Sequence, residues 1–392
     1  MGDGDAGVSS RPRILIVGGG IAGLTLAALL RQRGECPEIV ERTRDYGGVG
    51  YAIALWPAGS DILKGLGLYG ALEAVAMRGE RYEIHDEHAA LLNRSSFAAV
   101  ERRFGPAHLV ERSRFIDVLR EGTEGVRLRM GTSVEALRDV GREVHVTFTD
   151  GTSGRYDLVV GADGLRSRVR ELVFGAVRPR YLGMTGWAFW LPEPAYAIVP
   201  PGMIREFWGA GRFGGLYPVP GRVCAFVAAT AREGTPDPVA HRVARLRELF
   251  AEFRGAAAEP FAHLPSAGEI WHDDFLDLRM PSWHRGRVVL IGDAAHAILP
   301  TAGIGASMAM ESAAVLADEL SRTDAGYVER ALERYAARRK PRVDRVQRES
   351  RLLGKLVALS SPPLVTLRDA GVRRLRETTI AKGFARVLAG PI

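Results

Sequence analysis

The alternation of apolar and polar positions divides the chain into short buried strands and longer amphipathic helices. The first apolar run covers residues 14–17, and an Ala- and Leu-rich helix is expected to follow it to about Arg33. A second strand is expected over 37–40, ending on Glu41. This order of strand, helix and strand is typical of the first unit of a parallel α/β sheet.

The middle of the chain alternates between β and α patterns. Helices are predicted at 57–66 and after Arg112, where Phe115, Val118 and Leu119 share one face. Strands are predicted at 81–86, 91–97, 126–130, 144–149 and 156–160. We interpret the last three as a β-meander, with Asp150-Gly151 as a hairpin turn.

From about Tyr181 to Trp271 the pattern changes to short aromatic-rich strands between Gly/Pro turns, followed by a charged helix over 239–254. This pattern predicts a second, antiparallel sheet. A buried strand is expected again over 286–293, then a helix from Ile304 to Leu320. Residues 327–359 predict a pair of helices broken near Pro341, because proline lacks the N–H that a continuing helix needs.

The predicted fold is therefore α/β, with a Rossmann-like parallel sheet, a β-meander crossover, an inserted antiparallel sheet and C-terminal helices. We expect a discontinuous nucleotide-binding domain made of residues 11–80, 98–180 and 276–350. Residues 81–97 and 181–275 would form a substrate domain, and 351–392 a C-terminal helical segment.

A glycine pattern lies between the first strand and its helix. Gly18, Gly20 and Gly23 form G-x-G-x-x-G. The first glycine permits the tight turn, the second lets backbone approach phosphates, and the third lets the helix pack close to the strand. Glu41 follows at roughly the 20-residue spacing of a ribose-binding acid. The stretch predicts a dinucleotide pyrophosphate bound at the N-terminus of the helix.

Composition narrows the possible partners. The formal net charge of +7 favours anions, including phosphorylated cofactors. The basic residues are spread along the chain without an aromatic-interleaved stripe, so nucleic-acid binding is not expected. No apolar run reaches the 18 or so residues of a membrane span, and no signal peptide is recognisable. Cys36, Cys224 and the histidines show no metal-ligand spacing, so we expect a cytoplasmic protein without a metal.

Two further motifs follow predicted strands. Residues 157–170 run from a strand into Asp163-Gly164 with basic residues beyond, and residues 291–300 run from a strand into Gly292-Asp293 and a loop. Together with the glycine pattern, in this order and over nearly the whole chain, they resemble the three motifs of the FAD-dependent aromatic hydroxylases. These are the flavoprotein monooxygenases similar to p-hydroxybenzoate hydroxylase.

The resemblance implies a set of FAD-binding residues. Gly18, Gly20 and Gly23 would take the pyrophosphate, Glu41 the adenosine ribose, and Asp293 the ribityl chain. Arg112 would approach the flavin, and Asp163 and Gly164 are associated with FAD and reduced nicotinamide. The resemblance also places Ala22, Arg42, Gly50, Pro300, Gly303, Ile304, Gly305 and Ala306 at the cofactor.

Physical reasoning supports the last of these segments independently. Reduced flavin carries negative charge on its pyrimidine edge, and Gly303-Ile304-Gly305 opens a helix whose free N–H groups and positive dipole end can face that charge. The family often has Gln at the position of Ile304 and Asn at that of Ser307. Backbone donation is retained with both changes, whereas side-chain contacts from these two positions are not expected to carry over.

The implied activity is that of a monooxygenase. NADPH or NADH would reduce FAD, O2 would form a flavin C4a-hydroperoxide, and one oxygen atom would enter an aromatic or polycyclic small molecule. Trp187, Trp208, Phe213 and Tyr217 are hypothetical substrate-lining residues because of their place in the second sheet. No catalytic side chain is assigned, and His296 is equally well explained by packing. We expect a monomer or homodimer.

Alternatives remain open at this point. The same scaffold could carry epoxidation, Baeyer–Villiger insertion or N-oxygenation of a natural product. The chain could also bind flavin or a ligand without turnover. Leu352, Leu353, Leu356, Val357 and Leu359 lie beside arginines and could form a membrane-surface helix, although a helix packed on the core is the favoured interpretation.

Overall fold

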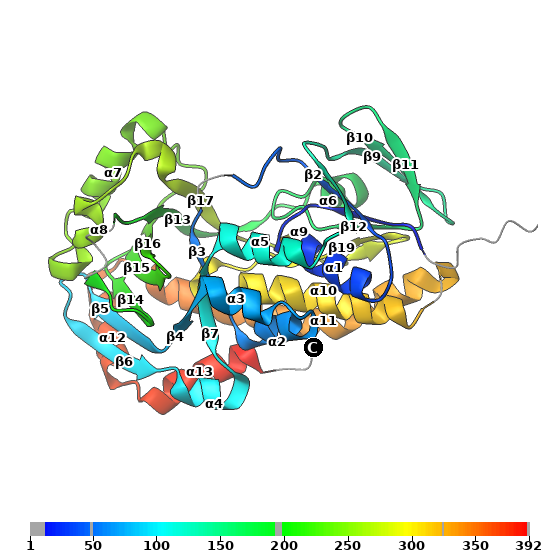
Figure 1. The fold of residues 1–392 in the computed structure, drawn as a ribbon. Helices are drawn as coiled ribbons and strands as arrows, with labels where there is room; N and C mark the ends of the chain where they lie inside the picture. The colour runs from blue at the N-terminus through cyan, green and yellow to red at the C-terminus, as the bar shows by residue number, and fades with distance from the viewer. Residues whose placement is uncertain (1–11, 48–49, 193–197, 324, 390–392) are drawn as a thin grey trace, which may run out of the picture.

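The computed structural model describes residues 12–47, 50–192, 198–323 and 325–389. Figure 1 shows a six-stranded sheet toward one end of an elongated molecule and a seven-stranded sheet toward the other. Two long helices, α10 (Gly305–Ser321) and α11 (Val328–Val357), run side by side along the middle. The mixed α/β fold agrees with the prediction.

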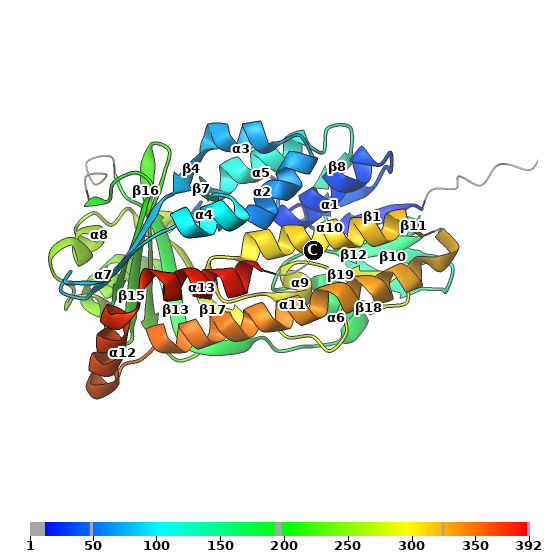
Figure 2. The ribbon, with the colours of Figure 1, turned by 90° about the horizontal axis from the view of Figure 1, so that it is seen from below.

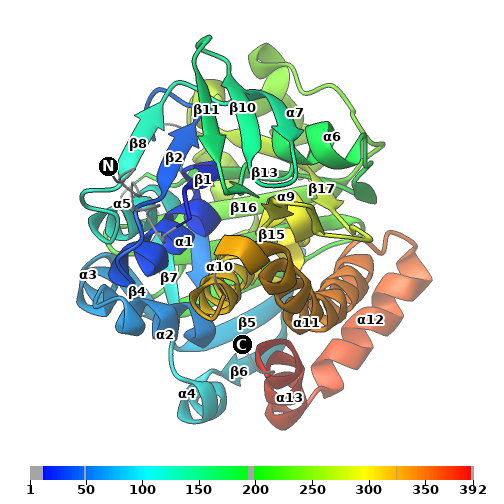
Figure 3. The ribbon, with the colours of Figure 1, turned by 90° about the vertical axis from the view of Figure 1, so that its right-hand side faces the viewer.

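The six-stranded sheet is parallel except at one edge. Its strand order is β18-β19-β12-β1-β2-β8, and only the β18–β19 pair is antiparallel. The strands are β1 (Ile14–Val17), β2 (Glu38–Glu41), β8 (Arg127–Met130), β12 (Leu158–Gly161), β18 (His284–Arg285) and β19 (Val288–Leu290). Helices α1 (Ile21–Gln32) and α10 lie on one side of this sheet (Figure 3). β1, β12 and β19 are buried along their whole length, as expected of parallel strands covered on both faces.

The β-meander on the opposite side of this sheet differs in composition from the prediction. It consists of β9 (Val134–Asp139), β10 (Val144–Phe148) and β11 (Ser153–Tyr156). β9 was missed because only Val134 is buried on this polar edge strand. The segments predicted as strands over 126–130 and 156–160 correspond to β8 and β12. Both strands lie in the parallel sheet, where β8 pairs with β2 and β12 pairs with β1.

The seven-stranded sheet joins two distant parts of the chain. Its order is β17-β13-β16-β15-β14-β5-β6. The strands are β5 (Arg81–Asp86), β6 (Leu91–Ser96), β13 (Arg180–Trp190), β14 (Met203–Trp208), β15 (Arg212–Val219), β16 (Arg222–Thr230) and β17 (Trp271–Asp277). Adjacent strands are antiparallel except β14 and β5, which run parallel because residues 81–86 enter the sheet from outside the aromatic-rich segment.

Smaller elements connect the two large sheets. A three-stranded sheet of order β3-β7-β4 contains β3 (Ala52–Leu55), β4 (Ala76–Gly79) and β7 (Ala107–Glu111). The helices around it are α2 (Pro57–Gly65), α3 (Tyr69–Val75), α4 (Ala98–Phe104) and α5 (Arg112–Glu121). The remaining α-helices before α10 are α6 (Arg168–Phe174), α7 (Arg242–Leu249), α8 (Glu259–Ala262) and α9 (Asp293–His296).

The predicted break at Pro341 is wrong, because α11 is one helix of 30 residues with Pro341 inside it. An interior proline costs a helix about 3 kcal/mol. Packing on both sides offsets that cost, since Tyr335 and Val346 belong to one core cluster. Arg339 and Arg342 also form ion pairs with the fully buried Glu311 of α10, at 2.7 and 2.6 Å.

Two helices follow α11, as the C-terminal prediction required: α12 (Pro362–Arg374) and α13 (Glu377–Leu388). Of the leucine-rich stretch, Val357 is buried, whereas Leu352 and Leu356 are exposed. In the described part of the chain, no helix combines the length and the apolar character that crossing a bilayer requires.

Candidate flavin site

The three glycines of the first motif have different surroundings in the turn from β1 to α1. Gly18 has a φ of +111°, and a Cβ there would lie 2.4 Å from the backbone oxygen of Ala162. A Cβ on Gly23 would lie 1.9 Å from the backbone oxygen of Gly18. Gly20, in contrast, has no atom within 4 Å of its Cβ position. Gly18 and Gly23 are therefore required by packing, whereas Gly20 leaves open space in front of the helix N-terminus.

Glu41 ends β2 beside this turn. Its carboxylate accepts hydrogen bonds from the Gly19 N–H at 2.8 Å and the Thr43 N–H at 2.9 Å. The Thr43 hydroxyl also donates to this carboxylate at 3.1 Å. A carboxylate has about four acceptor positions, so about one remains for a ribose hydroxyl. Arg42 is exposed next to it.

The Asp-Gly motif shapes the turn in a way that the sequence did not indicate. Asp163 accepts hydrogen bonds from the Ser167 hydroxyl at 2.5 Å and the Arg168 N–H at 2.7 Å, so its carboxylate stabilises the start of α6. Its Cα lies 2.9 Å from the Cβ position of Gly18. Gly164 follows with a φ of +79° and faces open space. Asp163 thus supports the glycine-rich turn from behind.

The Gly-Asp motif brings a carboxylate to the same turn. Gly292 has a φ of +58°, and a Cβ there would lie 2.8 Å from that of Ala22 on α1. The next side chain, Asp293, is exposed to solvent and has no hydrogen-bond partner among the described residues. The surrounding protein nevertheless raises the pKa of Asp293 to about 6, against an opposing effect of Arg112. A carboxylate that solvent reaches although protein surrounds it lies in a cleft.

Arg112 lies near the same cleft, at the first position of α5. Its N–H donates to the carbonyl of Tyr51 at 2.9 Å. Its half-buried guanidinium has no hydrogen-bond or ion-pair partner in the described chain. Burial raises the pKa of Tyr51 and that of Asp293, and the charge of Arg112 opposes both shifts, so the three side chains are neighbours. The cleft therefore contains both an unpaired anion and an unpaired cation.

The loop before α10 completes this group of sites. Pro300 begins a short 3₁₀ turn, Gly303 has a φ of +58°, and a Cβ on Gly305 would meet no atom within 4 Å. The carbonyl of Gly303 accepts a hydrogen bond from Trp56 Nε1 at 3.0 Å. Ile304 is buried, and Ala306 lies in the first helical turn. Space is therefore open in front of the positive end of α10.

Ser307 and Gly50 lie behind the open side of the cleft. Ser307 stands where the family often has Asn. Its buried hydroxyl accepts a hydrogen bond from the backbone N–H of Trp56 at 2.9 Å. It therefore has a structural contact within the protein. A Cβ on Gly50 would lie 3.3 Å from Glu111 and 3.7 Å from Trp190 Nε1, so the chain passes closely over the seven-stranded sheet there.

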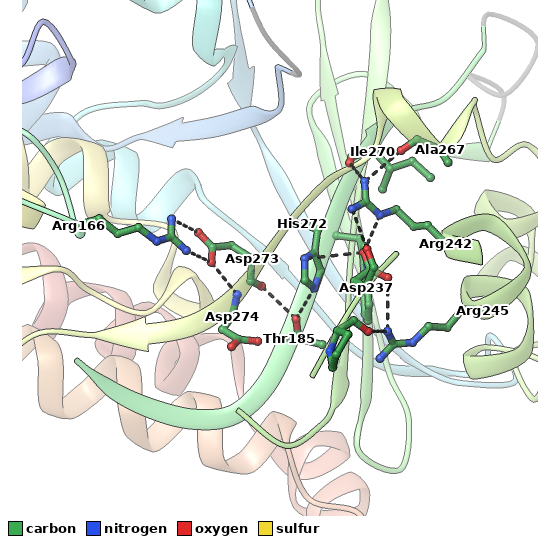
Figure 4. A network of polar contacts seen from close by, with 12 residues as sticks. Arg166, Thr185, Asp237, Arg242, Arg245, Ala267, Ile270, His272, Asp273 and Asp274 are labelled. Carbon is green, nitrogen blue, oxygen red and sulfur yellow. Dashed lines mark hydrogen bonds and ion pairs between the residues drawn. The ribbon is translucent and has the colours of Figure 1, made fainter. Parts of the chain in front are cut away.

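The four hypothetical substrate residues do not share one face of that sheet. Trp187 is fully buried on the outer face, in a cluster with Leu246 of α7, and its Nε1 donates to Asp237 at 3.1 Å. Figure 4 shows Asp237 held by Arg242, with which it makes a hydrogen bond of 2.5 Å. Successive side chains of a strand point to opposite faces, so Trp187 points away from the inner face. It belongs to the core under α7 and not to a substrate cavity.

Trp208, Phe213 and Tyr217 lie on the inner face. Trp208 and Phe213 are nearly fully buried and pack in a cluster with Phe275 and Val357. Tyr217 stays partly exposed. Three further residues near this face were missed by sequence reasoning: Tyr51, Tyr82 and Glu206. For Glu206 the only signal was strand parity, since 204, 206 and 208 share one side of β14.

His296 has a packing role. It is buried, its Nε2 lies 2.8 Å from the Ser312 hydroxyl, and its ring lies 4.9 Å from that of Trp283. Burial lowers the pKa of His296 to about 3, so it is neutral at physiological pH. Among the described residues, no group of three or more His, Cys, Asp or Glu side chains is placed to hold a metal ion.

Comparison with known proteins agrees with this geometry. A family model described as an FAD binding domain matches residues 11–350. The 2-heptyl-3-hydroxy-4(1H)-quinolone synthase of Pseudomonas aeruginosa is 32% identical over 385 residues, covering 96% of this chain and 98% of that protein. A 3-amino-4-hydroxybenzoate 2-monooxygenase of Streptomyces platensis is 35% identical over 403 residues, covering 97% and 98%.

A solved structure extends the comparison to three dimensions. The crystal structure of Klebsiella pneumoniae HpxO complexed with FAD and uric acid matches with a TM-score of 0.87, at 26% identity and 96% coverage of each chain. The family match spans most of the sequence, and the Streptomyces relative is named as a monooxygenase. The chain therefore belongs to the FAD-dependent aromatic monooxygenases similar to p-hydroxybenzoate hydroxylase.

Proposed function

We propose that this monooxygenase uses NADPH or NADH and O2 to insert one oxygen atom into a small, nitrogen-bearing aromatic molecule. One observation carries the proposal: Asp293 and Arg112 lie in one cleft without a partner among the described residues, beside the open helix N-termini of α1 and α10. Polar groups in a protein interior normally have partners, so a charged and polar ligand fits this cleft.

FAD could use the donors and acceptors of this cleft as follows. The N–H groups at the start of α1, next to Gly20, would hold the pyrophosphate. Glu41 would accept from the adenosine ribose, and Asp293 from the hydroxyls of the ribityl chain. The N-terminus of α10 would face the pyrimidine edge of the flavin, where its dipole stabilises negative charge.

Bound FAD supplies hydride acceptance from the nicotinamide and activation of O2. The chain's own residues have to orient the substrate and exclude water from the reacting atoms. The inner face of the seven-stranded sheet, together with residues 50–56, would form the walls for this task. Arg112 would balance negative charge near the flavin, since no carboxylate neutralises its guanidinium in the described chain.

The substrate class rests on the relatives. The names of two of them specify a quinolone and an aminohydroxybenzoate, and the solved structure contains uric acid. All three compounds are planar and carry nitrogen. We extend this common chemistry to the present chain.

The test is the visible spectrum of the purified protein before and after anaerobic addition of NADPH or NADH. We expect a two-band flavin spectrum that is bleached by the nicotinamide, faster when a nitrogen-bearing aromatic compound is present. Oxygen should then restore the spectrum, with consumption of one O2 per product. A protein that takes up no FAD would refute the proposal, and stable bleaching without product would favour a flavin protein without turnover.

A further inference from the structure

A carboxyl group lies inside the seven-stranded sheet domain without a cation. Glu206 of β14 accepts hydrogen bonds from the Tyr82 hydroxyl at 2.5 Å, Trp208 Nε1 at 3.0 Å and the Tyr217 hydroxyl at 3.1 Å. No arginine, lysine or histidine of the described chain forms an ion pair with it. Buried carboxylates usually have a cation, so three neutral donors are an unusual environment.

Solvent reaches Glu206 and two of its three donors. Burial raises the pKa of Glu206 and, more strongly, those of Tyr82 and Tyr217. All three side chains nevertheless remain partly accessible to solvent, whereas Trp208 and Phe213 on the same face are nearly fully buried. Side chains that lie deep in the protein and are still reached by solvent are expected at the wall of a cavity.

One wall of this cavity leads toward the cleft that contains Asp293 and Arg112. Tyr217 pairs across the strands with Cys224, and Cys224 pairs with Trp190. The Cβ position of Gly50 lies 3.7 Å from Trp190 Nε1, and the next residue, Tyr51, is the neighbour of Arg112 and Asp293 described above. Neighbouring residues thus connect Glu206 with the cleft.

The opposite wall leads to the loop before α10. The Tyr82 ring lies 6.2 Å from that of Phe384 on α13, and Phe384 lies 5.1 Å from Trp56. Trp56 Nε1 in turn donates to the carbonyl of Gly303. A row of aromatic side chains therefore extends from Glu206 to the loop before α10, which suits a planar ring.

The charge and hydrogen-bonding capacity of this cavity select among aromatic ligands. The carboxyl oxygens of Glu206 use three of about four acceptor positions, so a further donor can bind without displacing a partner. A carboxylate ligand would lie beside a carboxyl group with no cation to stabilise it, which is unfavourable. Neutral ligands with an N–H or O–H donor are therefore preferred over benzoate-type anions.

We propose that Glu206 is the specificity-determining residue of the substrate cavity, where its carboxyl group accepts a hydrogen bond from a ring N–H or hydroxyl of a neutral aromatic substrate. Tyr82 and Tyr217 are positioning residues that hold this carboxyl group. The inference rests on the proposed function, since it defines which nitrogen-bearing rings the monooxygenase accepts.

The test uses the FAD-loaded full chain and matched probes. 4(1H)-Quinolinone and 4(1H)-pyridinone each carry one N–H, and their N-methyl derivatives lack it; 4-hydroxybenzoate supplies an anion. Dissociation constants are measured by perturbation of the flavin spectrum and by calorimetry. We expect at least one N–H probe to bind at least tenfold more tightly than its N-methyl partner and than 4-hydroxybenzoate.

Two variants test whether Glu206 causes the preference for N–H probes. Glu206→Leu should abolish the difference between the N–H and N-methyl probes, and the near-isosteric Glu206→Gln should reduce it severalfold while the flavin spectrum stays unchanged. Glu252→Gln, which alters an exposed carboxylate, serves as the control and should retain the wild-type preference. If Glu206→Leu does not fold, the Glu206→Gln comparison still decides.

The outcomes separate the inference from the proposed function. A wild-type protein that binds no FAD would contradict the proposed function. A flavin-loaded protein that is bleached by nicotinamide but binds each probe pair equally, prefers 4-hydroxybenzoate or binds none of the probes would overturn the role of Glu206. Unchanged discrimination in Glu206→Gln and Glu206→Leu would overturn it as well.

Discussion

The cleft around Asp293 and the proposed cavity around Glu206 differ in how their polar groups are paired. In the cleft, Asp293 and Arg112 lack partners in the described chain. In the cavity, Glu206 already accepts three hydrogen bonds. A resident cofactor can supply missing partners permanently, whereas a substrate that enters and leaves has to find a cavity that is stable without it.

The difference also concerns backbone geometry. The cleft depends on glycines at which a side chain would collide with neighbouring backbone, as at Gly18 and Gly23. The cavity depends on side chains carried by regular strands, whose backbone tolerates substitution. Changes in the cleft should therefore affect folding and cofactor binding together, and changes in the cavity should affect selectivity with little loss of stability.

The largest effect is expected for the glycines of the first turn. Gly23→Ala should lower the free energy of unfolding by about 3 kcal/mol and abolish FAD retention, because its Cβ would overlap the Gly18 carbonyl. Gly20→Ala should leave the apo protein stable but weaken FAD binding, because its Cβ would meet no protein atom and would enter the space proposed for the pyrophosphate. Urea unfolding and FAD titration measure the two effects. Gly70→Ala, whose Cβ meets nothing within 4 Å, is the control.

The next effect tests the unpaired carboxylate. Asp293→Asn should weaken FAD binding by about 10- to 100-fold through loss of a charge-assisted hydrogen bond. The folded-state pKa of Asp293, raised to about 6, means that the folded apo protein binds the proton more tightly than the unfolded chain. Apo stability should therefore fall as pH rises from about 4 to 6, and this fall should be smaller in Asp293→Asn.

Melting temperatures of the apo protein between pH 4 and pH 8 measure this stability profile, and flavin fluorescence measures the FAD affinity. Asp61→Asn, in an exposed pair with Lys64, is the matched control and should change neither. Equal FAD affinity of Asp293→Asn and wild type would show that FAD does not depend on Asp293 as an acceptor.

A smaller effect separates the two faces of the seven-stranded sheet. Trp187→Phe should lower stability by about 1–3 kcal/mol, because it deletes buried volume and leaves Asp237 with one donor fewer. Tyr217→Phe should change stability by less than about 1 kcal/mol and alter the affinity for 4(1H)-quinolinone instead. Urea unfolding and probe titration of both variants provide the measurement, and a substrate effect of Trp187→Phe alone would reverse the assignment of the faces.

The smallest effect under physiological conditions concerns His296 behind the cleft. Its pKa is lowered to about 3, so the unfolded chain takes up a proton at higher pH than the folded protein does. Stability should be fully present above about pH 6.5 and fall by about 1.4 kcal/mol by pH 5.5. His296→Gln should flatten this part of the pH profile, measured by urea unfolding. A profile identical to that of wild type would show that another group titrates there.

Much of the nucleotide-binding half could be predicted because its signals are local. The strand over 14–17, the glycines at 18, 20 and 23 and the acid at Glu41 lie within one βαβ unit, where neighbours in sequence are neighbours in space. The same holds for Gly303 and the start of α10. Asp163 is the exception, because its hydrogen bonds to the start of α6 are visible only in the folded turn.

In the second half, the sequence predicted the sheet and four hypothetical substrate residues, but not which of these residues share one face. Strand parity separates Trp187 from Trp208 and Tyr217 only once the sheet has a known inner face, and that face is defined by residues 50–56 and by Phe384 of α13. Pro341 is a similar case, since a local rule predicts a break where packing against α10 maintains the helix.

The sequence by itself determined the fold class, the glycine-rich turn and the family. Each depends on spacing within a short segment, where backbone geometry dictates which residue types fit. The tertiary structure alone decided that Asp163 supports a turn, that Trp187 is core, and that Glu206 meets Tyr82 across 124 positions of chain. Burial and hydrogen bonding depend on contacts between distant segments, and one strand's pattern does not contain them.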